Sequence, residues 1–240
     1  MTSKILLIIP AYNEAEGILE TINSVETYRL ESPYAFDYVV INDGSTDNEE
    51  AVLREHNINH VELIQNLGIG GAVQAGYIYA ADHDYDIAIQ FDGDGQHDIE
   101  SLPKLVEPIL KGEADFVVGS RFVENSTSEF KSTGARQAGI TILSWLIKLT
   151  SKVTIKDVTS GYRAGNRKVI EQFINRYPSQ YPEPESYMHL FSRNFVVKEV
   201  GVKMFERETG QSSINFWKGI SYMISVSLSI LATSVLKGGE

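Results

Sequence analysis

Two aspartates near the middle of the chain could hold a metal ion. Asp92 and Asp94 lie two residues apart, directly after the apolar run Ile87–Phe91. In extended backbone, side chains two residues apart point the same way, so both carboxylates can bind one hard divalent cation. Such a cation keeps coordination positions for substrate phosphates. The alternative is a simple turn, because Asp-Gly dipeptides are frequent in turns.

Polar or glycine-containing turns follow the other apolar runs as well. These runs are rich in β-branched residues and alternate with segments of helical period, which predicts βα repeats around a mostly parallel sheet. In such sheets ligands bind outside the carboxyl ends of the strands. We therefore expect the chemistry in the turns Tyr12–Glu14, Asn42–Ser45, Asn66–Gly68, Asp92–Gly95 and Gly119–Arg121.

The elements that must position these turns can be placed from the pattern. Ile18, Ile22 and Val25 have helical spacing, and the run from Asp98 to Leu110 indicates another helix. The glycines in Gly68–Gly71 let the chain turn tightly into a helix, whose N-terminus could face an anion. The expected strands are Ile5–Ile9, Tyr38–Ile41, Val61–Ile64, Ile87–Phe91 and Phe116–Val118.

Composition narrows the function classes. The 240 residues carry 21 Lys and Arg against 32 Asp and Glu, a net charge of −11, which repels nucleic-acid backbones and argues against a nucleic-acid binder. The chain has no cysteine, so a disulfide scaffold, a thiolate zinc site and a cysteine nucleophile are excluded. The apolar run Ile5–Ile9 is shorter than a signal-peptide core, so a cytoplasmic location is expected.

The order and spacing of the motifs are more specific than any one of them. Ile9–Glu14, Ile41–Asp47, Asn66–Gly68, Gln90–His97 and Gly119–Arg121 together resemble the family 2 glycosyltransferases of GT-A fold. The later stretches Asp157–Arg163, Tyr181–Glu185 and Arg207–Ile214 are similar to the polyprenyl-phosphate sugar synthases of that family. The resemblance covers residues 4 to about 214.

The resemblance implies a fold and a reaction. The fold is a Rossmann-like, three-layer α/β/α domain over residues 1–214, with a nucleotide-sugar half (1–122), an acceptor half (123–214) and a C-terminal amphipathic helix (215–240). The reaction is inverting transfer of a sugar from a nucleotide sugar, expected to carry UDP, to a lipid-linked acceptor. That acceptor is a polyprenyl phosphate or a lipid-linked saccharide in cell-surface glycan synthesis.

The resemblance also assigns donor-site roles. Tyr12 would border the base, Glu14 the ribose, and Asp43 would hydrogen-bond the base, while Asp92 and Asp94 would hold Mg²⁺ or Mn²⁺ against the donor diphosphate. The structural alternatives are that Asn13 and Ser45 serve as helix N-terminal groups and that Tyr12 simply packs against its neighbours. The full expected donor set is Pro10, Tyr12, Asn13, Glu14, Asp43, Ser45, Asn66, Gly68, Gln90, Asp92, Gly93, Arg121 and Arg207.

For the acceptor side, the resemblance places the catalytic base at Glu185, with Asp157 as second choice. Arg163, Glu183 and His97 would line the acceptor site, with surface ion pairs, solvated loop charges and a structural histidine as the alternatives. Some relatives carry a lysine where this chain has Ile69, so phosphate binding here must depend more on metal and arginine.

The C-terminal segment departs from relatives that continue into membrane spans. Gly219–Leu236 is uncharged but contains many serines, and an apolar stripe passes through Phe216, Ile224 and Leu228. We expect a helix that contacts the cytoplasmic face of a membrane peripherally or a second copy of the chain.

Two other functions fit part of the pattern. Phe91–Gly95 resembles the nucleophile motif of haloacid-dehalogenase-like phosphotransferases, in which Asp92 would attack a phosphoester. That fold places its nucleophile after the first strand, whereas three βα units precede Asp92 here. A non-catalytic sugar-binding module of the same fold is the other alternative.

Overall fold

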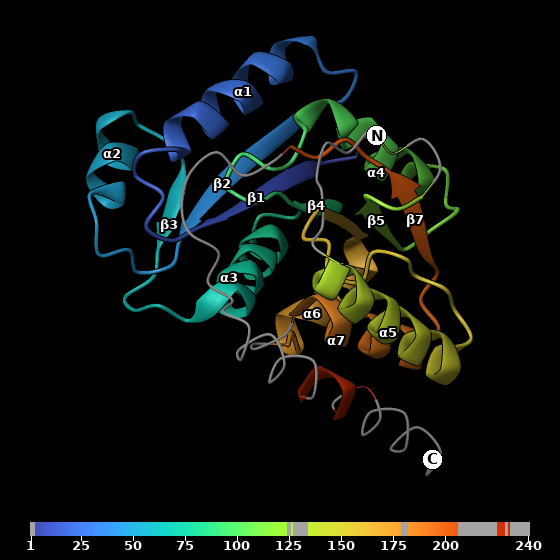
Figure 1. Ribbon diagram of the computed structural model, residues 1–240. Coiled ribbons are helices and arrows are strands. Elements are labelled where there is room, and N and C mark those ends of the chain that lie inside the picture. Colours follow the sequence, from blue (N-terminus) through green and yellow to red (C-terminus); the bar gives the residue numbers. More distant parts are fainter. Residues whose placement is uncertain are drawn as a thin grey trace.

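A seven-stranded, mostly parallel sheet forms the centre of the protein (Figure 1). The computed structural model describes residues 3–123, 126, 134–178, 182–205, 225–228 and 230. The strand order is β3-β2-β1-β4-β6-β5-β7, in which β6 runs antiparallel to both β4 and β5. The strands are β1 (Ile5–Ala11), β2 (Phe36–Asn42), β3 (His60–Glu62), β4 (Ile87–Gln90), β5 (Phe116–Ser120), β6 (Arg163–Asn166) and β7 (Val197–Gly201).

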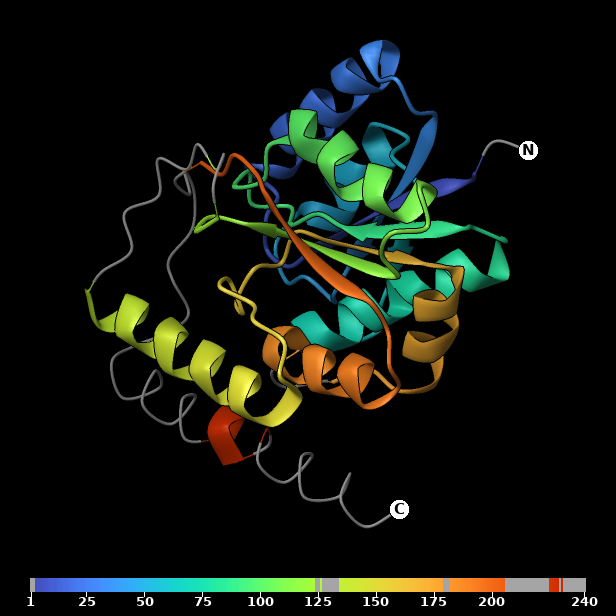
Figure 2. The same cartoon turned by 90° about the vertical axis from the view of Figure 1, so that its right-hand side faces the viewer.

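Helices cover both faces of the sheet, as Figures 1 and 2 show. One face carries α1 (Ile18–Glu31) and α4 (Leu102–Leu110), which follows the 3-10 turn η1 (Ile99–Ser101), and α2 (Glu49–Glu55) packs Leu53 into the same layer. The other face carries α3 (Gly68–Asp82), α5 (Gly134–Ser151), α6 (Arg167–Asn175) and α7 (Pro182–Ser192).

Strand β1 shows why the sequence builds three layers. Its residues are all buried, and they alternate between two cores: Leu6 and Ile8 face α3, whereas Leu7 and Ile9 face α1. A central strand covered on both faces has a continuous apolar run instead of a polar alternation. The expected three-layer α/β/α architecture is therefore confirmed.

All five strands predicted from the sequence are present, each within two residues at its ends. Ile18, Ile22 and Val25 form the buried face of α1, as their spacing indicated. Strands β6 and β7 were not predicted, because β6 is four residues long and includes a glycine, and β7 is only partly buried.

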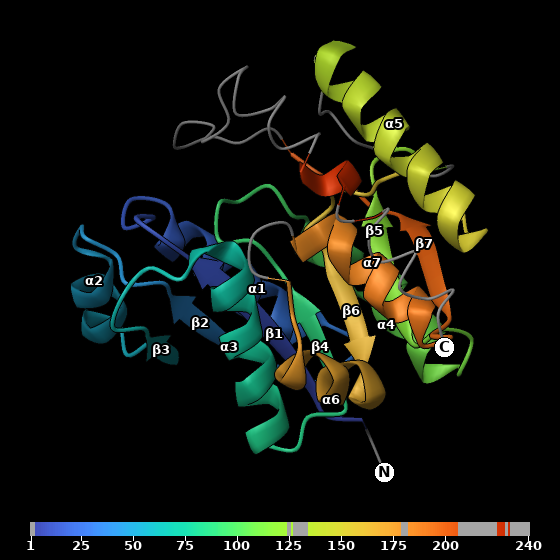
Figure 3. The same ribbon diagram turned by 90° about the horizontal axis from the view of Figure 1, so that it is seen from below.

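Part of the C-terminal segment packs on the core. Residues 225–228 and 230 are helical, and they lie beside α5 in Figures 2 and 3. Val226 and Ile230 are buried, whereas Leu228, placed on the apolar stripe by the sequence, is 61% exposed. The rest of the predicted helix 215–240 lies outside the described residues, so the domain division stays a prediction. Within the described part of the chain, no helix is long and apolar enough to cross a membrane.

Candidate active site

The turns after β1 and β2 are joined by hydrogen bonds. Asn13 adopts a left-handed conformation, with φ of 56°. Its backbone N–H donates to Ser45 Oγ at 2.9 Å, and its side-chain oxygen accepts the N–H of Thr46 at 2.8 Å. Ala15 N–H donates to Asp47 Oδ2 at 3.1 Å. The two turns therefore form one rigid corner at the carboxyl end of the sheet.

A buried glutamate that the sequence reasoning missed lies behind this corner. Glu49, the first residue of α2, is 0% exposed. Its Oε2 accepts the N–H of Glu14 at 2.8 Å and the hydroxyl of Ser45 at 3.1 Å, while Oε1 has no hydrogen-bond partner. Burial raises the Glu49 pKa, and the Glu14 N–H opposes that rise.

A cavity opens at the same corner. Its volume is about 510 Å³, and its lining comes from residues 13–16 and 46–48. Tyr12, just before it, is 43% exposed, and Glu14 is half-buried. Tyr12 and Glu14, the side chains expected at the base and the ribose, therefore project from a turn whose backbone is held by hydrogen bonds. Pro10, also expected in the donor site, is buried in β1.

Asp43 joins the end of β2 to the start of α3. Its Oδ1 accepts the N–H of Leu67 at 2.7 Å, and the Asn66 side chain accepts the N–H of Gly68 at 3.1 Å. Burial raises the Asp43 pKa, and the N–H groups of Leu67 and Gly68 counter it. Asp43 is only 3% exposed, so it fixes the turn that precedes α3.

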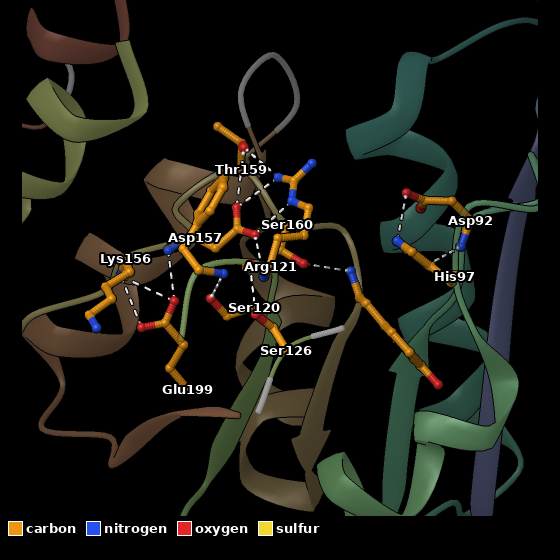
Figure 4. A network of polar contacts seen from close by, with 12 residues as sticks. Asp92, His97, Ser120, Arg121, Ser126, Lys156, Asp157, Thr159, Ser160 and Glu199 are labelled. Atoms are coloured by element: carbon orange, nitrogen blue, oxygen red, sulfur yellow. Dashed lines mark hydrogen bonds and ion pairs between the residues drawn. The ribbon is translucent and has the colours of Figure 1, made fainter. Parts of the chain in front are cut away.

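The Asp92 carboxylate is oriented by two neighbours. Gln90 Nε2 donates to Asp92 Oδ1 at 3.0 Å. The Asp92 N–H donates to His97 Nδ1 at 3.0 Å, which leaves the ring proton on Nε2, 3.6 Å from Asp92 Oδ2 (Figure 4). The Asp92 side chain is 31% exposed, so it is held in place while remaining accessible to a ligand.

The Asp92 and Asp94 carboxylates fit a hard cation that also binds substrate. Asp94 is partly exposed, and its Oδ1 accepts the N–H of Gln96 at 3.1 Å. Among the described residues, no three acidic or histidine side chains group as a complete metal cage. Mg²⁺ and Mn²⁺ accept oxygen ligands, and Mg²⁺ is commonly held by one or two carboxylates plus phosphate oxygens and water.

Close packing leaves no room for a side chain beside Asp92. A Cβ added to Gly161 would lie 2.4 Å from Asp92 Oδ2, and one added to Gly93 would lie 3.2 Å from the Pro10 carbonyl oxygen. The Asp157–Arg163 and Gln90–His97 motifs, far apart in sequence, therefore meet at the Asp92 carboxylate.

His97 is packed as a structural residue. It is 7% exposed and stacks on Tyr162, with ring centroids 4.8 Å apart and an interplanar angle of 11°. Phe91 contacts the ring edge-on at 5.5 Å. The predicted acceptor contact of His97 stays untested, and its observed contacts are with the aromatic cluster and Asp92.

Arg163 is enclosed in protein. It is 1% exposed, and its Nη2 donates to Gln90 Oε1 at 2.7 Å and to Tyr177 Oη at 2.8 Å. Its Nη1 donates to Ser186 Oγ of α7 at 2.9 Å. Arg163 therefore connects the Gln90–Asp92 pair to α7, and this placement favours a supporting role over direct contact with an acceptor.

The two glutamates expected on the acceptor side lie in the first turn of α7. Glu183 and Glu185 are both partly exposed. Burial raises the Glu183 pKa, Arg163 opposes the rise, and Asp92 adds to it. The first turn of α7 is thus close enough to Asp92 for their charges to interact.

Arg121 and Asp157 form a buried ion pair (Figure 4). Arg121 Nε and Nη2 donate to the two Asp157 oxygens at 2.8 and 2.7 Å, and the Arg121 N–H donates to Oδ2 at 3.0 Å. Thr159 accepts a further bond from Nη2 at 3.0 Å. The Asp157 side chain is 0% exposed, so its carboxylate neutralises Arg121 and is closed to solvent.

The structure thus brings most predicted site residues to one edge of the sheet. Arg207 lies outside the described residues. Glu49 was missed because an acidic residue in a first helical turn is common and carries no sign of burial.

Comparisons with known proteins agree with this geometry. The family model described as glycosyl transferase family 2 matches residues 6–174. UDP-N-acetylglucosamine–dolichyl-phosphate N-acetylglucosaminyltransferase of Methanococcus voltae is 31% identical over 185 residues, covering 70% of this chain and 71% of the relative. Undecaprenyl-phosphate mannosyltransferase of Micrococcus luteus is 29% identical, covering 88% of each chain.

Solved structures show the same fold. Glucosyl-3-phosphoglycerate synthase from Mycobacterium tuberculosis, in complex with Mn²⁺, UDP and phosphoglyceric acid, superimposes with a TM-score of 0.69 at 19% identity, covering 99% of this chain and 79% of that one. The match over residues 6–174 places the Asp92–Asp94 motif and both interlocked turns inside the family domain, which favours glycosyl transfer over the phosphotransferase alternative. This chain is therefore a glycosyltransferase and belongs to glycosyl transferase family 2.

Proposed function

We propose that this protein transfers a sugar from a UDP-sugar to a polyprenyl phosphate, with inversion at the anomeric carbon and dependence on Mg²⁺ or Mn²⁺. The observation that carries the proposal is the accessible Asp92 carboxylate, oriented by Gln90 and His97 at the end of β4. It lies on the same edge of the sheet as the rigid corner that presents Tyr12 and Glu14.

The relatives support the donor and the acceptor. The Methanococcus voltae relative is named for a UDP-sugar donor and a dolichyl-phosphate acceptor, and the Micrococcus luteus relative for an undecaprenyl-phosphate acceptor. The Mycobacterium tuberculosis structure holds UDP and Mn²⁺. The acceptors of these relatives favour a lipid-phosphate acceptor for this chain. The UDP-sugar donor of one relative and the UDP bound in the solved structure favour a uridine nucleotide.

Donor binding divides between two groups of residues. Tyr12 and Glu14 would contact the nucleoside, and Asp92 and Asp94 would hold the cation, which would stabilise charge on the leaving diphosphate. Gln90 and His97 keep the Asp92 carboxylate oriented before the donor arrives, so little reorganisation is needed on binding.

On the acceptor side we place Glu185 ahead of Asp157 as the base. Glu185 is partly exposed in the first turn of α7, whereas Asp157 is buried against Arg121. A phosphate monoester is already largely ionised near neutral pH, because its second pKa is about 6. A strong base is therefore unnecessary, and Glu185 would orient the acceptor and take a proton only from the monoanionic fraction of the phosphate.

Thermal unfolding with UDP tests the donor site. A ligand at about 100 times its Kd stabilises the folded state by about 2.7 kcal/mol, or roughly 5–11 °C for a chain of this size. We expect this shift with UDP and Mn²⁺ for the wild type and for the surface control Asp84→Asn, and its loss in Asp94→Asn. An equal shift in Asp94→Asn would exclude the metal role.

Turnover tests the acceptor. Sugar transfer from a UDP-sugar to undecaprenyl phosphate should be measurable in detergent. Glu185→Gln should lower kcat and change the donor KM little. Transfer to water alone, with no lipid product for any UDP-sugar, would refute the polyprenyl-phosphate acceptor.

A further inference from the structure

We propose that Glu49 is a positioning residue for donor binding, which holds the backbone of the β1–α1 turn so that Tyr12 and Glu14 meet the nucleoside. The inference rests on the proposed function, because it concerns how that donor site is built. Glu49 would not touch the donor itself.

The hydrogen bonds form a continuous chain from one turn to the other. Asn13 N–H donates to Ser45 Oγ at 2.9 Å, and the Ser45 hydroxyl donates to Glu49 Oε2 at 3.1 Å. The same Oε2 accepts the Glu14 N–H at 2.8 Å. One carboxylate oxygen therefore fixes two consecutive backbone N–H groups, one directly and one through a hydroxyl.

The burial of Glu49 points to a role outside its own helix. A buried carboxylate is costly unless it is hydrogen-bonded, and the Glu49 side chain makes its hydrogen bonds to Ser45 and to Glu14 of the β1–α1 turn. The next residue, Glu50, pairs with Arg54 at 2.6 Å on the surface of α2. A glutamate in the first turn of α2 can therefore stay on the surface, as Glu50 does. The burial of Glu49 is explained by its hydrogen bonds to the β1–α1 turn and not by its own helix.

The hydrogen bonds also hold the backbone conformation of the turn. Asn13 has a left-handed φ of 56°, which is uncommon for non-glycine residues, although asparagine adopts it more readily than most. Without Glu49, Ser45 keeps its bond to Asn13 but loses the acceptor that orients its hydroxyl, and the Glu14 N–H loses its partner. The Tyr12 and Glu14 side chains would then sample other directions before the nucleotide binds.

Alanine at position 49 should therefore weaken nucleotide binding and spare the chemical step. We expect Glu49→Ala to raise the Kd for UDP, titrated calorimetrically in saturating Mn²⁺, about tenfold or more, the effect of losing the charge-assisted hydrogen bond from the Glu14 N–H. The donor KM should rise by a similar factor, with kcat at saturating donor within about twofold of the wild type. Acceptor KM should not change.

Two further variants separate positioning from stability. Glu49→Gln keeps an acceptor oxygen and should recover most of the UDP affinity, whereas Glu50→Ala on the same helix should bind UDP as the wild type does. Ser45→Ala should weaken UDP binding in the same direction, and adding it to Glu49→Ala should cost less than the product of the two single effects, because both act through one chain of bonds.

The outcomes are distinct. Wild-type protein that does not bind UDP would overturn the proposed function. If wild type and Glu50→Ala bind UDP and Glu49→Ala binds it equally well, or loses kcat instead, the positioning role of Glu49 is wrong. If Glu49→Ala does not fold, the Kd for UDP is measured on Glu49→Gln and Ser45→Ala instead. Wild-type affinity in Ser45→Ala would then overturn it.

Discussion

Replacing Asp157 by asparagine should destabilise the protein strongly, because it removes one partner of a buried ion pair. Arg121 donates three hydrogen bonds to the Asp157 carboxylate, of 2.8, 2.7 and 3.0 Å. The two side chains are 8% and 0% exposed. In Asp157→Asn the guanidinium keeps its charge but faces an amide that presents one oxygen and an N–H₂ group.

The magnitude follows from that burial. Removing one partner of a buried ion pair costs about 3–5 kcal/mol, since the other charge stays desolvated without compensation. For a chain of this size, 1 kcal/mol shifts Tm by about 2–4 °C, so Tm should fall by roughly 6–20 °C. The double variant Asp157→Leu, Arg121→Met removes both charges and should recover part of that loss.

Thermal unfolding followed by circular dichroism measures the effect, and Glu113→Gln is the control. Glu113 pairs with Lys198 at 2.5 Å, but both side chains are about half exposed, so its loss should change Tm little. If Asp157→Asn unfolds within about 2 °C of the wild type and loses kcat, Asp157 acts as the base and the structural interpretation is refuted.

Gly161, His189 and the C-terminal segment give three further predictions. Gly161→Ala should displace the Asp92 carboxylate, because the new Cβ would lie 2.4 Å from Asp92 Oδ2. The Mn²⁺ concentration that half-saturates activity should therefore rise severalfold. An unchanged concentration would contradict this packing. Burial, with smaller effects of nearby arginines, lowers the His189 pKa from 6.5 to about 4, so the unfolded chain takes up the proton first and stability is lost as pH falls from about 6.5 towards 4. The wild-type Tm should drop across that range more steeply than that of His189→Gln, and parallel curves would exclude this contribution. Removal of the residues after Ile214 should abolish co-sedimentation with anionic vesicles or change the oligomer mass; a truncated protein that matches the full chain in both measurements would exclude the predicted surface role of 215–240.

The sequence was sufficient for those parts of the fold that depend on local pattern. The buried strand Ile5–Ala11 is a continuous apolar run, and the first buried helix shows its period through Ile18, Ile22 and Val25. Strand β6 could not be predicted, because its four residues Arg163–Asn166 show neither alternation nor an apolar run. Its place in the sheet depends on pairing with β4 and β5, which are distant in sequence.

The same limit applies to the site. The Asp92–Asp94 pair could be identified from spacing, since both residues follow one strand. The partners of Asp157 and Glu49 could not, because Arg121 is 36 residues away from the first and Glu14 is 35 residues from the second. A carboxylate that binds a distant backbone or guanidinium looks in sequence like one exposed to solvent.

The antiparallel strand β6 connects the residues expected on the donor side to those expected on the acceptor side. In the sheet register, Arg163 pairs with Gln90, so the guanidinium lies beside the amide that orients Asp92. The other arm of Arg163 bonds Ser186 in the first turns of α7, close to Glu185. A parallel strand at this position would run the other way along the sheet, and its first residue would lie at the opposite edge. The single reversed strand is thus what places one buried cation between the expected metal carboxylate and the expected base.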